Sequence, residues 1–199
     1  MLKPLLVLAL LMLTGVLAGC PQPPAGASAP SQALASEKKL QEARRLNEQA
    51  TRNIAEGNLE EAQRKLEAAI EMDPSFGPAH NNLGILFFRQ ERFHQAAWEF
   101  RAAARLLPDK VQPRNNEGRV FEGVGKLTEA LKSYDEAHKL EPANPEIAAN
   151  LARMMLLTGR REPRLRALLE LVAATDTRAK WQAWAREQLA MLPVTQPGR

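Results

Sequence analysis

Residues 77–110 decide the fold of this chain, and they read GPAHNNLGILFFRQERFHQAAWEFRAAARLLPDK. Apolar and small side chains recur at helical spacing on both sides of a polar break at Gln90–Arg92, and Pro108 ends the second run. The pattern predicts two antiparallel helices, each too short to be stable alone in water. Such a hairpin needs neighbours against which it can bury its apolar face.

The same pattern returns when the sequence is shifted by 34 residues in either direction. Three small or apolar positions of the second helix recur in consecutive units: Ala62, Leu66 and Ala69, then Ala96, Phe100 and Ala103, then Ala130, Tyr134 and Ala137. A fixed period of this length is typical of a solenoid, in which stacked hairpins share one continuous core. We therefore predict an all-α fold.

The 77–110 unit also carries a recognisable signature, formed by Leu83, Gly84, Phe87, Ala96, Phe100, Ala103 and Pro108. With these residues the unit resembles a tetratricopeptide repeat, although His80 stands where the family prefers a tryptophan. The resemblance implies an α-solenoid of about four helix-hairpin repeats, at residues 43–76, 77–110, 111–144 and 145–178.

The third and fourth units each depart from the signature. Glu117 replaces the usual leucine of the third unit, and Arg164 replaces the usual small alanine of the fourth. Because of Arg164, we expect the second helix of the fourth unit to begin late, at Pro163. It would then pack through Leu165, Leu168, Leu169 and Val172.

Four glycines have expected structural roles. Gly84 and Gly118 fall where the two helices of a repeat approach most closely, so a larger side chain there is expected to overpack the core. Gly125 and Gly159 are interpreted as helix-ending turns.

We expect the repeat domain to cover residues 37–192, with Ser36 as the N-cap of its first helix. At the other end, Thr175–Thr177 offers N-cap oxygens for a last helix at about residues 177–192. We expect residues 193–199 to form a disordered tail.

Trp181 and Trp184 share the apolar stripe of this last helix with Ala185, Gln188 and Leu192. The stripe predicts a capping helix that covers the exposed end of the stack. The alternative is that the two tryptophans form a partner site.

Residues 1–19 have the pattern of an export signal. Lys3 precedes a short apolar run, and Leu17-Ala18-Gly19-Cys20 follows it. These last four residues resemble the lipobox of bacterial lipoproteins, which implies that Cys20 is acylated and that the chain is tethered to a bilayer. The alternative is an ordinary secretory signal with an incidental cysteine.

The residue after the cysteine bears on which membrane holds the chain. In lipoproteins of bacteria with two membranes an aspartate there retains the protein at the inner membrane, and this chain has Pro21. The resemblance therefore implies the outer membrane facing the periplasm, or the outer cell surface in a bacterium with one membrane. Residues 20–36 are rich in proline, alanine and serine and are expected to form an extended spacer.

Composition and motifs favour an interaction protein over an enzyme. A net charge of +4 is too small to indicate nucleic-acid binding. His80, His94 and His138 are far apart and have no cysteine cluster beside them, and none of the common catalytic or phosphate-binding motifs is found. We therefore predict no catalytic residue, no metal site and no cofactor.

The resemblance implies that the first helix of each repeat lines a concave groove. It places the following residues on or beside that groove: Asn81, Asn82, Ile85, Phe88, Arg89, Asn115, Asn116, Arg119, Glu122, Asn150 and Arg153. Asn82, Asn116 and Asn150 recur at the repeat period, and their carboxamides could hold the backbone of an extended peptide. The alternative is that they only bond neighbouring helices.

Chaperone-binding members of the family hold a terminal carboxylate with a clamp of lysine, asparagine and arginine. The corresponding positions here carry Asn47, Thr51, Gln112 and Asn116, so that clamp is absent. A basic run at Arg153, Arg160, Arg161, Arg164 and Arg166 is either a solvated face or a contact for acidic partners.

Together these features predict a lipid-anchored interaction scaffold or adaptor in the bacterial cell envelope. It would bind a peptide or partner protein of the pilus, secretin or peptidoglycan-processing kind. The alternatives are a non-catalytic accessory subunit of an envelope enzyme complex and a structural homo-oligomer formed through the terminal helix.

Overall fold

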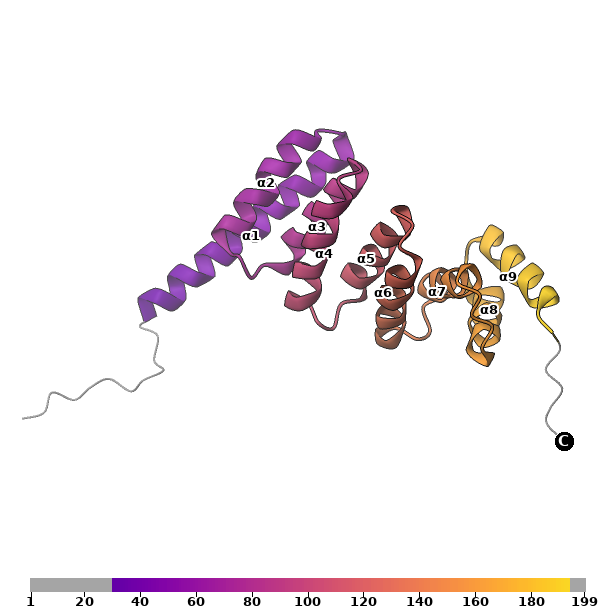
Figure 1. Cartoon of the computed structure of the whole chain (residues 1–199). Coiled ribbons are helices and arrows are strands. Elements are labelled where there is room, and N and C mark those ends of the chain that lie inside the picture. Colours follow the sequence, from indigo (N-terminus) through magenta and orange to yellow (C-terminus); the bar gives the residue numbers. More distant parts are fainter. Residues whose placement is uncertain (1–29, 194–199) are drawn as a thin grey trace, which may run out of the picture.

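The computed structural model describes residues 30–193, and every regular element in that range is an α-helix. The nine helices of this range are α1 (Pro30–Glu56), α2 (Leu59–Met72), α3 (Gly77–Arg89), α4 (Phe93–Leu106), α5 (Val111–Gly123), α6 (Leu127–Leu140), α7 (Pro145–Leu157), α8 (Pro163–Thr175) and α9 (Ala179–Met191). They pair as hairpins that follow one another along an elongated stack, from α1 at one end to α9 at the other (Figure 1). The prediction of an all-α solenoid of four hairpins with a terminal helix is confirmed.

The repeated positions form the core of the stack. Ala96 and Phe100 of α4 are buried, and so are Ala130 and Tyr134 at the same positions of α6. Fully burying a side chain as large as Phe100 stabilises the fold by about 1.5–3 kcal/mol. The 34-residue period therefore identifies the buried faces of α2, α4 and α6.

Gly84 and Gly118 lie tightly against the second helices of their hairpins, with no room for a larger side chain, as predicted. A Cβ atom added at Gly84 would lie 2.8 Å from the Phe100 ring, and one at Gly118 would lie 2.7 Å from the Tyr134 ring. Gly125 and Gly159 end their helices with φ of +74° and +73°, in the left-handed region that glycine adopts without strain.

Glu117 is almost fully buried at the position where the family has leucine. Its carboxylate accepts hydrogen bonds from Arg101 Nε at 2.6 Å and from Ser133 Oγ at 3.3 Å. These two donors from the helices on either side satisfy an acid that would otherwise be costly to bury.

The fourth repeat also follows its prediction. Its second helix, α8, begins at Pro163 and buries Leu165, Leu168, Leu169 and Val172. Arg164 lies at the surface, where its guanidinium pairs with the Asp135 carboxylate of α6. The arginine therefore has a partner outside the core.

The predicted start of the first helix is wrong. The helix α1 begins at Pro30, so Ser36 lies inside it and is not an N-cap, and residues 30–36 are not part of an extended spacer. Proline is tolerated in the first turn of a helix, and residues 31–36 contain neither proline nor glycine to interrupt it. Predictions for residues 1–29, which include the signal segment and Cys20, and for residues 194–199 lie outside the described residues.

The last helix packs on the end of the stack. Ala185 and Leu192 are buried, and the Trp181 and Trp184 rings meet edge to face with centroids 5.2 Å apart while packing on the same core. Its N-cap residue is Arg178, so the prediction of a cap within Thr175–Thr177 is wrong. No helix between residues 30 and 193 combines the length and apolarity needed to cross a bilayer.

Candidate partner-binding groove

The first helices of the repeats line two adjoining hollows. We call the first the Phe93 hollow; it has a volume of about 590 Å³ and is lined by Ile85, Phe88, Arg89, Glu91, Phe93, Phe100, Asn116 and Arg119. We call the second the Arg153 hollow; it has a volume of about 550 Å³ and is lined by Phe88, Arg119, Glu122, Gly123, Glu146, Asn150, Arg153 and Arg178. Phe88 and Arg119 belong to both, so the two hollows form one continuous groove along α3, α5 and α7.

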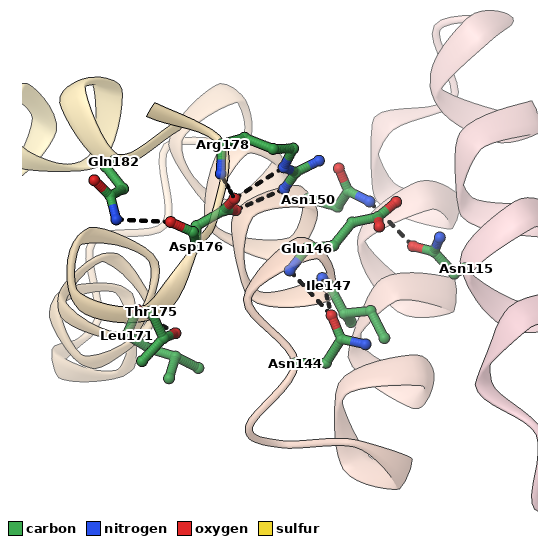
Figure 2. Close-up of polar contacts among 10 residues, drawn as sticks. All are labelled: Asn115, Asn144, Glu146, Ile147, Asn150, Leu171, Thr175, Asp176, Arg178 and Gln182. Atoms are coloured by element: carbon green, nitrogen blue, oxygen red, sulfur yellow. Dashed lines mark hydrogen bonds and ion pairs between the residues drawn. The ribbon is translucent and has the colours of Figure 1, made fainter. Parts of the chain in front are cut away.

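Most of the predicted groove residues line these hollows, but Asn81, Asn82 and Asn115 do not. The asparagines also form hydrogen bonds across the repeat boundaries. Each repeated asparagine donates its Nδ2 to an asparagine of the preceding first helix: Asn82 to Asn47 at 2.8 Å, Asn116 to Asn81 at 3.3 Å, and Asn150 to Asn115 at 3.0 Å. Figure 2 shows the last of these pairs, between α7 and α5.

The asparagine ladder therefore joins consecutive first helices, which is the second of the two roles predicted for it. A side-chain amide that already donates one N–H to the neighbouring repeat has one fewer N–H to donate to the backbone of a bound peptide. Asn116 and Asn150 still line the groove and keep part of their polar surface there.

Aromatic rings and arginines dominate the Phe93 hollow. The Phe88 and Phe93 rings meet edge to face with centroids 5.8 Å apart, and the Arg119 guanidinium lies 5.1 Å from the Phe88 centroid. Arg89 and Arg119 are exposed, and among the described residues neither has a carboxylate partner. The hollow thus combines an apolar floor with two arginines and one glutamate, Glu91, none of which forms an ion pair among the described residues, so its lining has a net charge of +1.

The charges of the Arg153 hollow are mostly compensated internally. The Glu122 carboxylate pairs with Arg153, whose Nη2 donates to it at 2.7 Å, and it also accepts a hydrogen bond from the Tyr134 hydroxyl at 3.0 Å. Burial lowers the pKa of Arg153 and raises the pKa of Tyr134. Two predicted groove residues, Glu122 and Arg153, therefore hold each other across α5 and α7.

The terminal helix contributes to the same hollow through the turn before it. The Asp176 carboxylate accepts from the Arg178 backbone N–H and from its guanidinium, both at 2.9 Å, and this points Arg178 toward α7 (Figure 2). The hydrogen bond from the Arg178 side chain lowers the pKa of Asp176. Trp181 lies beneath two cations, with Arg153 and Arg178 at 5.8 and 5.2 Å from its ring centroid.

Sequence reasoning missed six residues that line the groove: Glu91, Phe93, Phe100, Gly123, Glu146 and Arg178. Phe93 opens the second helix of its hairpin, where the family pattern gives no reason to expect a groove residue. Arg178 lies in the turn between α8 and α9, outside the regular part of the repeat.

The histidines show no metal-binding geometry. Among residues 30–193 no group of three or more histidine, cysteine, aspartate or glutamate side chains could hold a metal ion. His80 Nδ1 lies 2.7 Å from Glu99 Oε2, and Nε2 lies 3.2 Å from the Pro74 carbonyl. The hydrogen bond to Glu99 raises the pKa of His80, which occupies the position of the family's tryptophan and joins α3 to α4.

Comparison with known proteins supports the repeat assignment. Residues 47–111 match the tetratricopeptide repeat family model. Over 114 residues, 57% of this chain, it is 27% identical to U-box domain-containing protein 70 of Oryza sativa subsp. japonica and 28% identical to the Hsp70-Hsp90 organising protein of Plasmodium falciparum. These matches span only 14% and 45% of the respective relatives.

Solved structures share the fold. The first tetratricopeptide domain of Spaghetti (RPAP3), bound to the HSP90 peptide SRMEEVD, superposes with a TM-score of 0.58 at 24% identity, covering 60% of this chain and 95% of that one. MamA superposes with a TM-score of 0.59 at 15% identity, covering 81% of this chain and 86% of that one. The repeats, the helices and these likenesses agree on a helix-hairpin solenoid of the tetratricopeptide kind, and the family model itself covers residues 47–111.

Proposed function

We propose that this chain is a non-catalytic adaptor that binds an extended segment of a partner protein in the groove along α3, α5 and α7. One observation carries the proposal: Phe88 lies between two open hollows, and the guanidinium groups of Arg89 and Arg119, which form no ion pair among the described residues, flank it. An apolar groove with a few convergent polar groups is a common form of ligand site.

The charges indicate the chemistry of the segment. An apolar side chain of the partner fits the floor made by Phe88 and Phe93, and acidic side chains fit Arg89 and Arg119. Each exposed ion pair contributes only about 0.2–1 kcal/mol, so most of the affinity has to come from the buried apolar contact. The arginines then select among apolar segments those that carry negative charge.

The likeness to the RPAP3 domain supports a peptide ligand, because that domain's structure contains an acidic peptide. The ligand of this chain should differ from it. Asn47, Thr51, Gln112 and Asn116 replace the residues that clamp a terminal carboxylate, and Asn47 and Asn116 are already bonded within the asparagine ladder. We therefore propose an internal acidic segment rather than a chain terminus.

The proposal also includes a membrane tether at Cys20. It is supported by the sequence pattern of residues 1–20, which resembles a lipoprotein signal. The adaptor would act in the bacterial cell envelope, at the outer membrane facing the periplasm, on partners of the pilus, secretin or peptidoglycan-processing kind. Replacing Cys20→Ser should move the chain from the membrane to the soluble fraction after cell lysis, and unchanged membrane association would contradict the tether.

The groove is tested by crosslinking in cells followed by a binding measurement. A photoreactive phenylalanine analogue at position 88 keeps an aromatic ring there and should capture the partner. Binding of the captured protein is then compared between the parent chain, the double variant Arg89→Glu/Arg119→Glu, and the control Arg44→Glu, which reverses the charge of an exposed arginine on α1.

The double variant should weaken binding by about tenfold or more, because two attractive pairs become repulsive, while the control should bind as the parent does. Equal weakening by the control would indicate a general effect of net charge. Full binding by the double variant would contradict the proposed site.

The oligomer formed through the terminal helix has less support. Trp181 and Trp184 pack on the core formed by α6–α9, so they are already occupied by contacts within the chain. The accessory-subunit alternative shares the groove mechanism and differs only in the identity of the partner.

A further inference from the structure

The outer face of α4 carries an exposed tryptophan that the groove does not use. Trp98 is 70% exposed, more than any other large apolar side chain reported for the described residues. Its neighbours Ala96 and Phe100 face the core, so Trp98 lies on the opposite side of α4.

The repeat itself shows that packing does not require an apolar residue there. Shifting the sequence by one period places Arg64 of α2 and Lys132 of α6 at the position of Trp98. Only the second repeat replaces this solvated cation with a tryptophan. Because the neighbouring repeats carry a cation at this position, packing within the stack does not account for the tryptophan.

Trp98 borders a hollow of about 550 Å³ between α2 and α4. Ile70 contributes apolar surface beside it, and three carboxylates line it: Glu67, Glu71 and Glu99. No lysine or arginine is among its lining residues. On a chain with a net charge of +4, this is a locally acidic, aromatic hollow.

The three carboxylates differ in whether they have a hydrogen-bond or ion-pair partner within the chain. Glu99 pairs with His80, and Glu67 accepts a hydrogen bond from Gln63 Nε2 at 2.8 Å. Glu71 has no hydrogen bond or ion pair with any described residue. At least Glu67 and Glu71 therefore keep negative charge that no cation neutralises within this part of the chain.

We propose that this hollow is a second interaction surface, which takes a lysine or arginine side chain from a segment of a partner protein. The aliphatic stem would lie on Ile70 and Trp98, the cation would stack on the indole face, and Glu67 and Glu71 would face its charge. The occupant is a protein segment rather than a bilayer, because these carboxylates are repelled by anionic lipid head groups. The surface lies on the second helices, so it remains open when the groove on the first helices is filled.

The probe is a capped peptide of alternating glycine and arginine, and its matched control has glutamate at each arginine position. The indole N–H signals of the full-length chain are followed by NMR, and Trp98→Phe identifies which of the three tryptophan signals belongs to Trp98. The arginine peptide should shift the Trp98 signal and leave the other two in place. Equal shifts with the glutamate peptide would overturn the proposal.

Affinity for the labelled arginine peptide is then measured by fluorescence anisotropy. Trp98→Lys and Glu71→Gln should each bind about two- to fivefold more weakly. The control Leu157→Lys also replaces an exposed apolar side chain with a cation, but on α7, and should bind as the parent does.

Trp98→Lys should fold normally, because the neighbouring repeats carry arginine and lysine at this position. If Trp98→Lys does not fold, the affinity of Glu71→Gln, on α2, for the arginine peptide is the test of the proposal. Unchanged affinity in Glu71→Gln, or a Trp98 signal shifted by phosphatidylglycerol vesicles and not by the arginine peptide, would refute the assignment.

Discussion

Replacing Gly118→Ala tests the close approach between α5 and α6. The new Cβ atom would lie 2.7 and 2.8 Å from two carbons of the Tyr134 ring, and both distances are shorter than the 3.0 Å below which Cβ atoms in proteins essentially never approach another heavy atom. The ring is fully buried, and its hydroxyl is held by Glu122 at 3.0 Å, so it has little freedom to move away. Overpacking of this kind costs about 1–3 kcal/mol, and the better helix propensity of alanine returns up to about 1 kcal/mol. We expect a net loss of about 1–2 kcal/mol.

Gly123→Ala, in the last turn of the same helix, is the matched control. Its Cβ atom would meet the Phe93 ring at 3.6 Å, an ordinary contact, so the variant should be as stable as the parent or slightly more stable. Urea unfolding followed by far-ultraviolet circular dichroism gives the midpoints, and several probes should be compared because repeat arrays do not always unfold in one step. If Gly118→Ala unfolds at the same or a higher urea concentration than Gly123→Ala, the close-packing argument is refuted.

Three further predictions concern the polar groups of the stack. The folded pKa of His80 is raised by its hydrogen bond to Glu99, so this contribution to stability is fully present below the unfolded pKa of about 6.5 and is lost as pH rises through the folded pKa. The thermal unfolding temperature of the parent should therefore fall as pH rises from below 6.5 through the folded pKa of His80, and His80→Gln should remove this fall. Burial lowers the pKa of His138 and gives the opposite pH dependence. The measurement is therefore the difference in unfolding temperature between the parent and His80→Gln at each pH. Asn82→Ala should lower the free energy of unfolding in urea by about 1 kcal/mol, because Asn47 Oδ1 loses the hydrogen bond that Asn82 donates to it. An unchanged urea midpoint would show that this hydrogen bond does not stabilise the stack. Glu117→Leu should raise the free energy of unfolding by about 1 kcal/mol or leave it unchanged, because an apolar side chain replaces a desolvated acid whose partner Arg101 is exposed to water, and a clear loss would mean that the Glu117–Arg101 pair is favourable.

Much of the fold could be predicted because the chain repeats. The period of 34 residues locates the buried face of each second helix, and the disagreement of one residue, Arg164, with that pattern was enough to predict the late start of α8. The start of α1 could not be predicted in the same way. Residues 30–36 precede the first complete repeat, and no local feature there forbids either a helix or an extended chain.

The candidate site was predictable at the level of helices but not of individual contacts. The resemblance pointed to the first helices α3, α5 and α7, which line the hollows, but not to α4, which supplies Phe93 and Phe100. It could not show that Asn82 and Asn150 already donate to the preceding repeat, or that Glu122 and Arg153 neutralise each other. Those outcomes depend on side-chain distances between helices that are about 30 residues apart in the chain.

By itself, the sequence of this protein determined the class of the fold, because a repeated pattern of small and apolar residues can be buried only by stacking like units. It also determined the export and tether hypothesis, which depends on residues 1–20 alone. The tertiary structure decided which polar groups remain available to a partner. Electrostatic neutralisation and hydrogen bonding depend on a few ångströms of separation, so only the folded arrangement could show that Arg89 and Arg119 have no ion pair among the described residues while Glu122, Arg153 and Arg178 find partners.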